Sequence, residues 1–422
     1  MVNALVVADD LTGALDTGHG FAAAGRGVTV SLSGERTGEG DRVDDDVLVV
    51  DADSRDEPPE RAARAIETIV SGTEYGLLYK KVDSTLRGNV VAEVDAALDA
   101  SGASVAVVAP AFPGTGRTTR EGVHLVEGKP LADAGYGVEE SALAAVFAPS
   151  RYPTEHLSLE AIAGGAASVR ETLEGWVGAE PSIVTCDAVT DDHLRTIADG
   201  AAALNGDALY VGSGGLAAHV CVPGEAVPIA SPPVRGDGAL AVAGSVNERT
   251  LDQVAAVPDA DLVVLNAAEA VRDPSGVAAR TVPEVATRLA RRGRAVLTAA
   301  TGPDDVERAG EAARGLRESG GRERVDAGER IARALSLVAV GVAREEQPRG
   351  LFLTGGSVAR ATLEELDGDR IGLAGEAIGE GIPEGWIGTG PVAGTRVVTK
   401  AGGFGSREAI VNFLDRVGTD DG

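Results

Sequence analysis

The sequence predicts an α/β protein of two domains, each a mainly parallel or mixed sheet flanked by helices, with a cleft between the domains. Three observations support this fold class. The chain has 422 residues, enough for two domains. Short apolar runs alternate with longer stretches rich in Ala, Glu and Arg. Pro and Gly cluster at 226–238, between two strand-like runs, as is typical of a domain boundary.

Unbroken apolar runs that end at Gly, Asp or Ser are typical of parallel strands buried on both faces. The intervening segments are long enough for helices, for example at 58–70 and 304–316. On this pattern we expect strands at 4–8, 47–51, 105–110, 209–213, 262–266, 295–299 and 350–354.

The boundary predicts an N-terminal domain over 1–230, a linker over 231–238 and a C-terminal domain over 239–422. A second loop-rich region, 109–137, is too long for a simple connection. Loops of that length are usually functional or disordered, and its Arg and Thr content favours a function.

The composition limits the partners. The net charge of −27 disfavours nucleic acid and anionic membranes. No apolar run approaches the roughly 20 residues of a membrane span, and the first residues lack signal-peptide features, so we expect a cytoplasmic protein with two free thiols. Only four of 38 basic residues are Lys, which together with the acidity indicates a halophilic protein; the alternative is an ordinary acidic cytosolic protein. The sequence leaves open whether the protein forms a homodimer.

Polar residues follow the first two strands of the N-terminal domain. Asp9 and Asp10 end the run 4–8, and Arg55 lies just beyond 47–51. Ligands of parallel sheets bind beyond the carboxyl ends of the strands, where two carboxylates could hold sugar hydroxyls or accept a proton. Alternatively, one Asp caps the following helix and Arg55 is a surface residue.

The run KKVDSTLRGN at 80–89 holds the densest polar chemistry of the chain. A small polyhydroxy acid would use each residue type, with cations for its carboxylate and Asp for its hydroxyls. Lys offers a compact ammonium where Arg offers a flat fork. The alternative is a solvated loop. A weaker signal is Arg117, which could reach an anion from the Pro- and Gly-rich loop 110–117.

Three Gly-rich turns follow strand-like runs in the C-terminal domain, at 243–245, 354–357 and 400–406, and each precedes a helical stretch. Strand, Gly-rich turn and helix N-terminus form a geometry that cradles phosphate. These turns predict a nucleotide site. No GxGxxG opens a βαβ unit, which disfavours a dinucleotide cofactor. No His pair has the spacing of metal ligands, so no protein metal site is expected.

The motifs together resemble the four-carbon acid sugar kinases. DDLTG, DSTLRGN, PAFPxxGR, VGSGGLA, AGS, TGG and TKAGGFG occur in this order over nearly the whole chain. The resemblance implies ATP-dependent phosphorylation of a tetronate-type acid such as threonate, erythronate or 3-oxo-tetronate, with the acid in the N-terminal domain and ATP in the C-terminal one. Where the family usually reads GGDTA, this chain has Ser357 and Val358 in place of the Asp and Thr.

Site residues follow from the resemblance and from the strand-end positions. Asp10 or Asp83 is the candidate catalytic base, and Mg²⁺ would accompany ATP. The candidate substrate-binding residues are Asp9, Asp10, Arg55, Lys81, Asp83, Ser84, Arg87 and Arg117. The candidate nucleotide-binding residues are Ser245, Gly355, Gly356, Ser357, Val358, Lys400, Gly402 and Gly403.

Two alternatives remain open from the sequence. The missing Asp and Thr of GGDTA are compatible with a non-catalytic sugar-acid-binding or sensory protein. A dehydrogenase acting on the same acids is the second alternative, which the absence of dinucleotide turns disfavours.

Overall fold

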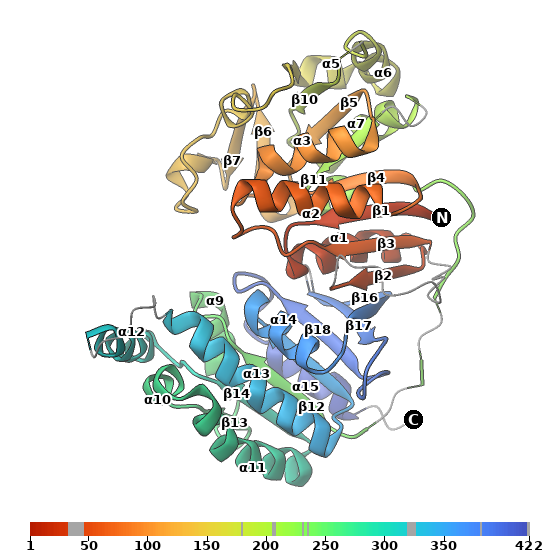
Figure 1. Cartoon of the computed structure of the whole chain (residues 1–422). Helices are drawn as coiled ribbons and strands as arrows, with labels where there is room; N and C mark the ends of the chain where they lie inside the picture. The colour runs from red at the N-terminus through yellow and green to blue at the C-terminus, as the bar shows by residue number, and fades with distance from the viewer. Residues whose placement is uncertain are drawn as a thin grey trace. The chain divides into compact units, whose positions relative to one another are not determined.

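The computed structural model describes residues 1–32, 46–178, 180–204, 208–229, 232–233, 236–318, 326–379 and 382–419. The chain divides into two compact units, Met1–Ile229 and Ala230–Gly422. Each unit is a helix-flanked sheet, which confirms the predicted two-domain α/β class (Figure 1). None of the described helices is long and apolar enough to cross a membrane.

The sheet of the first unit is parallel throughout its described pairings. Its central strands are buried on both faces, which accounts for their mostly apolar sequences, whereas the edge strand β9 (Thr154–Leu157) is more polar and partly exposed. The strand order is β2 (Val28–Ser31), β3 (Val47–Asp51), β1 (Val2–Ala8), β4 (Tyr75–Lys81), β11 (Ala208–Gly212), β5 (Val105–Ala109), β10 (Ser182–Cys186) and β9 (Thr154–Leu157).

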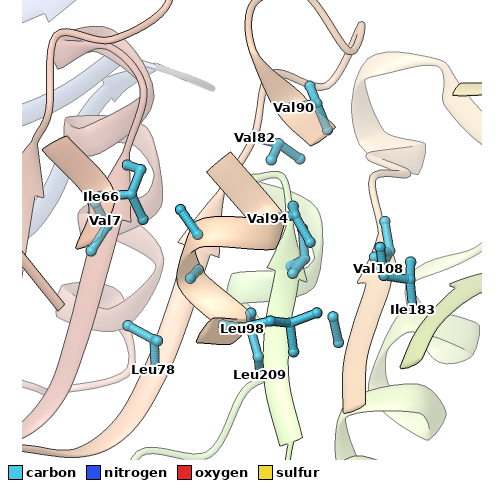
Figure 2. Packing of buried hydrophobic residues seen from close by; sticks show 14 of the residues in the cluster. Val7, Ile66, Leu78, Val82, Val90, Val94, Leu98, Val108, Ile183 and Leu209 are labelled. Atoms are coloured by element: carbon cyan, nitrogen blue, oxygen red, sulfur yellow. The ribbon is translucent and has the colours of Figure 1, made fainter. Parts of the chain in front are cut away.

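Helices α2 (Pro59–Ser71) and α3 (Val90–Ser101) lie side by side on one face of this sheet (Figure 1). Figure 2 shows the core beneath them, where Leu98 of α3 packs with Leu209 of β11. The other described helices are α1 (Leu11–Ala23), α4 (Leu143–Val146), α5 (Leu159–Ala163), α6 (Ala166–Glu174), α7 (Asp191–Ala202) and α8 (Gly214–Ala217).

The loop-rich region 109–137 contains a small antiparallel sheet that periodicity did not reveal. Its strands are β6 (Arg117–Arg120), β7 (Val123–Val126) and β8 (Lys129–Pro130). Glu121 and Gly122 have positive φ at the β6–β7 turn, and Asp187 accepts hydrogen bonds from both of their N–H groups. These strands are only two to four residues long, which explains why the sequence resembled a loop.

The second unit has a mixed sheet. Strands β13 (Leu262–Val264), β14 (Arg294–Thr298), β12 (Ala239–Ala243), β15 (Gly350–Thr354) and β18 (Arg396–Lys400) are parallel neighbours in that order. Two antiparallel strands, β17 (Ile382–Ile387) and β16 (Arg370–Gly379), continue the sheet beyond β18.

Helix α15 (Ala409–Thr419) packs on one face of this sheet, where Phe413 meets Phe352 of β15 with ring centroids 5.3 Å apart. Helices α13 (Ala327–Glu346) and α14 (Gly356–Glu365) pack against each other. The remaining described helices are α9 (Glu248–Ala255), α10 (Ala267–Arg272), α11 (Pro274–Arg292) and α12 (Pro303–Glu318).

Both units change direction in the same way. The chain runs from β1 out to β2, returns to β3 and then crosses to β4 on the far side of β1; β12, β13, β14 and β15 repeat this order. In open α/β sheets, ligands bind at the carboxyl ends of the strands where the winding reverses. The topology therefore predicts ligand sites at the carboxyl ends of β1, β3 and β4 in one unit and of β12 and its neighbours in the other.

Candidate active site

The ends of β3, β1 and β4 bring the predicted sugar-acid residues together. Ala8 of β1 lies opposite Asp51 of β3, and Val7 lies opposite Lys80 of β4. The residues that follow these strands must therefore meet at one edge. We call the resulting group the strand-end cluster; it comprises Asp9, Asp10, Arg55, Lys81, Asp83 and Arg87.

Arg55 joins the two carboxylates that follow β1. Its Nε donates to Asp9 Oδ2 at 2.7 Å, while Nη1 and Nη2 donate to Asp10 Oδ2 and Oδ1 at 2.7 and 2.8 Å. The N–H groups of Ser54 and Arg55 also donate to the Asp9 carbonyl, which holds the turn after β3 against β1. Arg55 thus belongs to the strand-end cluster and is not an isolated surface residue.

The two neighbouring carboxylates differ in their electrostatics. Burial raises the pKa of Asp9, but the charges of Arg55 and Lys81 outweigh it and leave that pKa below its ordinary value. For Asp10, burial and the adjacent Asp9 outweigh Arg55, so its pKa is raised. Asp10 also caps α1, with Oδ1 accepting from Gly13 N at 2.9 Å. The capping and ligand-facing interpretations of this Asp pair are therefore compatible.

Asp83 is held more tightly than Asp10. Arg87 forms a fork on it, with Nε–Oδ2 and Nη2–Oδ1 distances of 2.6 and 3.0 Å, and Thr85 Oγ1 donates to Oδ2. Burial raises the pKa of Asp83, but Arg87 and Arg55 more than reverse this, so the pKa lies far below its usual range. The lowered pKa favours the ionised carboxylate of Asp83, which pairs with Arg87 at 2.6 Å and with Arg55 at 3.9 Å.

Lys81 is the cation of the cluster that has no direct partner among the described residues. Its side chain is buried, yet the ammonium makes no hydrogen bond or ion pair with any described residue. The group lies beside the start of α1, because a Cβ added at Gly13 would be 2.7 Å from both Lys81 Nζ and Asp10 Oδ1. This glycine, which the sequence analysis did not select, leaves the room that the ammonium occupies.

Ser84 and Arg117 are linked to the cluster through a residue that sequence reasoning assigned no site role. His124 of β7 is fully buried, and its Nε2 donates to the Ser84 carbonyl at 2.8 Å. Arg117 hydrogen bonds Tyr136 Oη at 3.3 Å through Nη2, and its Nε is buried without a partner among the described atoms. The small sheet therefore supports the loop after β4, but no hydrogen bond joins Arg117 to the cluster in the described chain.

The three Gly-rich turns of the second unit also converge. They follow the adjacent strands β12, β15 and β18, and we call them the glycine-turn cluster (243–245, 354–357 and 400–403). Gly244 N donates to the Thr354 carbonyl at 2.9 Å, and Gly355 N donates to the Lys400 carbonyl at 3.2 Å. A Cβ at Gly402 would lie 2.2 Å from Ser245 Oγ, so these two turns touch.

The second turn leads into a helix N-terminus that no side chain caps. Gly355 has φ +98°, which favours glycine, and α14 begins at Gly356 without a side-chain cap. The N–H groups of Gly356, Ser357 and Val358 belong to its first turn. The Val358 side chain is buried against Gly244, so only its backbone can face a ligand.

Lys400 shapes the third turn. Its ammonium donates to the carbonyls of Ala401 and Gly402 at 2.9 and 3.0 Å and to Thr250 Oγ1 at 3.2 Å. Burial, followed by the charge of Arg249, lowers its pKa to about 8. Gln253 Nε2 holds the same loop through the carbonyls of Phe404 and Ser406. Neither Thr250 nor Gln253 was predicted, since both look like ordinary helix-surface residues in sequence.

Neither cluster resembles a protein metal centre. Among the residues that the structure describes, no group of three or more His, Cys, Asp or Glu side chains is placed to hold a metal ion.

Comparison with known proteins connects both units to one family. Residues 4–220 match the family model described as a sugar-binding N-terminal domain, and residues 240–410 match a nucleotide-binding C-terminal domain. The chain is 34% identical to D-threonate kinase of Cupriavidus necator over 96% of both chains. It is 27% identical to 3-oxo-tetronate kinase of Pseudomonas fluorescens over 97% of this chain and 96% of that one.

A crystal structure from Salmonella typhimurium LT2 shares the fold, with a TM-score of 0.80 at 20% identity over 98% of this chain and 99% of that one. The full-length relatives are kinases, which confirms the prediction of an enzyme over a sensory protein or a dehydrogenase. The chain therefore belongs to the four-carbon acid sugar kinase family.

Proposed function

We propose that this kinase transfers the γ-phosphoryl group of ATP to a hydroxyl of a four-carbon sugar acid of the threonate, erythronate or 3-oxo-tetronate type. The observation that carries the proposal is the buried ammonium of Lys81, which lies amid three carboxylates and two guanidinium groups and has no direct partner in the described parts of the chain. Such a group binds an incoming carboxylate, while the neighbouring Asp oxygens accept hydrogen bonds from hydroxyls.

Lys81 is the proposed ligand of the acid's carboxylate. Arg55 and Arg87 already donate to Asp9, Asp10 and Asp83, so their donors are engaged before a substrate arrives. The six charges of the strand-end cluster balance, and Lys81 is the one whose partner is missing among the described side chains. In this proposal the two Arg residues orient the Asp side chains, and Lys81 provides the binding charge.

Asp10 is the proposed base, and Asp83 the proposed anchor. The Asp10 side chain is 25% exposed against 11% for Asp83, and Arg55 is the one described donor to its Oδ2. Its raised pKa makes it the better proton acceptor. The attacking hydroxyl oxygen forms the new bond to the γ-phosphorus as its proton passes to Asp10, and the bond to the bridging oxygen breaks to release ADP.

The glycine-turn cluster is the proposed site of the nucleotide phosphates. Uncapped N–H groups at the start of α14 and the dipole of that helix favour an anion there. Lys400 supports this site by shaping the turn at Gly402 and contributes positive charge next to it. Transfer requires the acid and the γ-phosphate to meet, so we propose that the two units close on their ligands and exclude water.

Magnesium fits this proposal as an ion carried mainly by the phosphates. The described side chains offer no cluster of three acidic or imidazole ligands, and Mg²⁺ in kinases is commonly held by one or two carboxylates together with phosphate oxygens and water. When bound, the ion would neutralise charge on the phosphates.

One screen tests the proposed function. The purified protein is incubated with ATP, Mg²⁺ and a panel of D- and L-threonate, D- and L-erythronate and 3-oxo-tetronate, and ADP release is followed at low and molar salt. We expect turnover with one or two members of the panel. Hydrolysis of ATP at the same rate with every acid, or release of no ADP at all, contradicts the proposal.

A further inference from the structure

Lys80, the neighbour of Lys81, points away from the strand-end cluster into the protein. Successive residues of a strand face opposite sides of the sheet, so only one of the two Lys residues can join the cluster. The Lys80 side chain is fully buried, and its ammonium donates to Glu93 Oε2 at 2.8 Å, to the Lys81 carbonyl at 2.7 Å and to the Val7 carbonyl at 3.2 Å. Each of the three N–H donors of the Lys80 ammonium thus has an acceptor.

Glu93 completes a buried link to the turn after β3. It lies in the first turn of helix α3 and is 1% exposed. Its Oε1 accepts from Ser54 Oγ at 2.7 Å. Ser54 in turn donates its N–H to the Asp9 carbonyl at 3.0 Å, and its own carbonyl accepts from Asn89 Nδ2 at 2.8 Å.

The pair therefore contacts every segment that carries the strand-end cluster. It binds β1 at Val7, two residues before Asp9; β4 at the backbone of Lys81; and the turn at Ser54, next to Arg55. A displacement of any one of these segments would stretch a charge-assisted hydrogen bond in a dry environment, where such bonds are strongest.

Stability alone does not explain a buried ion pair at this position. Removing two charges from water is costly, and well-packed apolar replacements of buried pairs are often as stable or more stable. We propose that Lys80 and Glu93 are positioning residues that set the spacing of Lys81, Arg55 and Asp9 for the sugar acid. This inference rests on the proposed function of the cluster.

The test replaces both charges together, in K80M/E93L. We expect a melting temperature equal to or above that of the wild type, a KM for the sugar acid raised about 10- to 100-fold and an unchanged KM for ATP. Hydrogen exchange of 52–56 and 81–87 is expected to become faster, because their common anchor is gone.

The chain offers a matched control at the opposite end of the same strands. Asp46 and Arg26 form a largely buried ion pair at 3.2 Å, and the Asp46 carbonyl accepts from the N–H groups of Asn3 and Ala4 at the start of β1. R26M/D46N removes this pair far from the strand ends. It is expected to change the melting temperature and leave the KM for the sugar acid as in the wild type.

Each outcome decides the inference. Wild-type KM and exchange rates in a folded K80M/E93L protein overturn it. If that protein does not fold, Ser54→Ala breaks only the link to Glu93, and an unchanged KM for the acid in this variant overturns the inference. If the wild type phosphorylates no four-carbon acid, the proposed function fails, and the exchange rates of 52–56 and 81–87 still decide whether the pair positions these segments.

Discussion

Replacing Lys81 by Met removes one positive charge from the strand-end cluster and keeps the aliphatic stem. Asp9, Asp10 and Asp83 then face only Arg55 and Arg87, so the cluster becomes net negative before an anionic substrate binds. A hydrogen bond to a charged group contributes about 1.5–3 kcal/mol. We therefore expect kcat/KM for the sugar acid to fall by roughly 10- to 150-fold, with an added loss from repulsion.

The assay is steady-state ADP release with the acid varied at saturating ATP, together with calorimetric titration of ATP. Binding of ATP is expected to remain near that of the wild type, because Lys81 belongs to the first unit and the glycine-turn cluster to the second. Lys129→Met is the matched control, since Lys129 is an exposed Lys of the same unit. Equal losses of acid and ATP affinity, or an unchanged kcat/KM, would refute the division of roles.

Four further predictions concern the two clusters and the surface. Gly13→Ala is expected to lower the melting temperature and to raise the KM for the acid, because its Cβ would lie 2.7 Å from both Lys81 Nζ and the capping Asp10 Oδ1; an unchanged KM contradicts this. Gly402→Ala is expected to cost about 1–3 kcal/mol in urea unfolding and to raise the KM for ATP. Gly403→Ala, whose Cβ meets only Asn247 Nδ2 at 3.9 Å, should keep the stability of the wild type. The proposed base Asp10 must be ionised, so kcat/KM is expected to fall as the pH drops through its raised pKa. In Asp10→Asn, kcat/KM should fall by about 10²- to 10⁴-fold, whereas Asp83→Asn should keep this loss of kcat/KM at low pH. The chain has a net charge of −27, and salt screens the repulsion between its charges because the Debye length falls from about 10 Å at 0.1 M to about 3 Å at 1 M. The melting temperature is therefore expected to rise between 0.1 and 1 M salt, and a decrease would argue against halophilic adaptation.

Local patterns were sufficient to predict the strands that carry the site. Asp9, Arg55 and Asp83 each follow an apolar run, and a strand end is a property of a few consecutive residues. The same holds for the glycine turns, since the preference of Gly355 for positive φ depends on its own backbone. Cytoplasmic location, adaptation to salt and a homodimer stay predictions.

The hydrogen-bond and ion-pair partners of these residues could not be predicted from local sequence in the same way. Nothing near Glu93 in the sequence distinguishes it from a surface Glu, and its burial depends on Lys80 and Ser54, which are 13 and 39 positions away. His124 lay in a segment taken as a loop, because such short strands give no clear period. Whether Lys80 or Lys81 joins the strand-end cluster depends on which face of β4 packs against α3.

What the sequence by itself determined is the set of polar groups and the strand ends at which they lie: carboxylates, guanidinium groups and the adjacent ammonium groups of Lys80 and Lys81 in the first unit, and the backbone amides of Gly-rich turns in the second. The tertiary structure decided which of these groups neutralise one another. Arg55 and Arg87 became partners of Asp residues, and Lys81 was left without a direct partner among the described residues, because parallel strands that are distant in sequence lie side by side only after the sheet has formed.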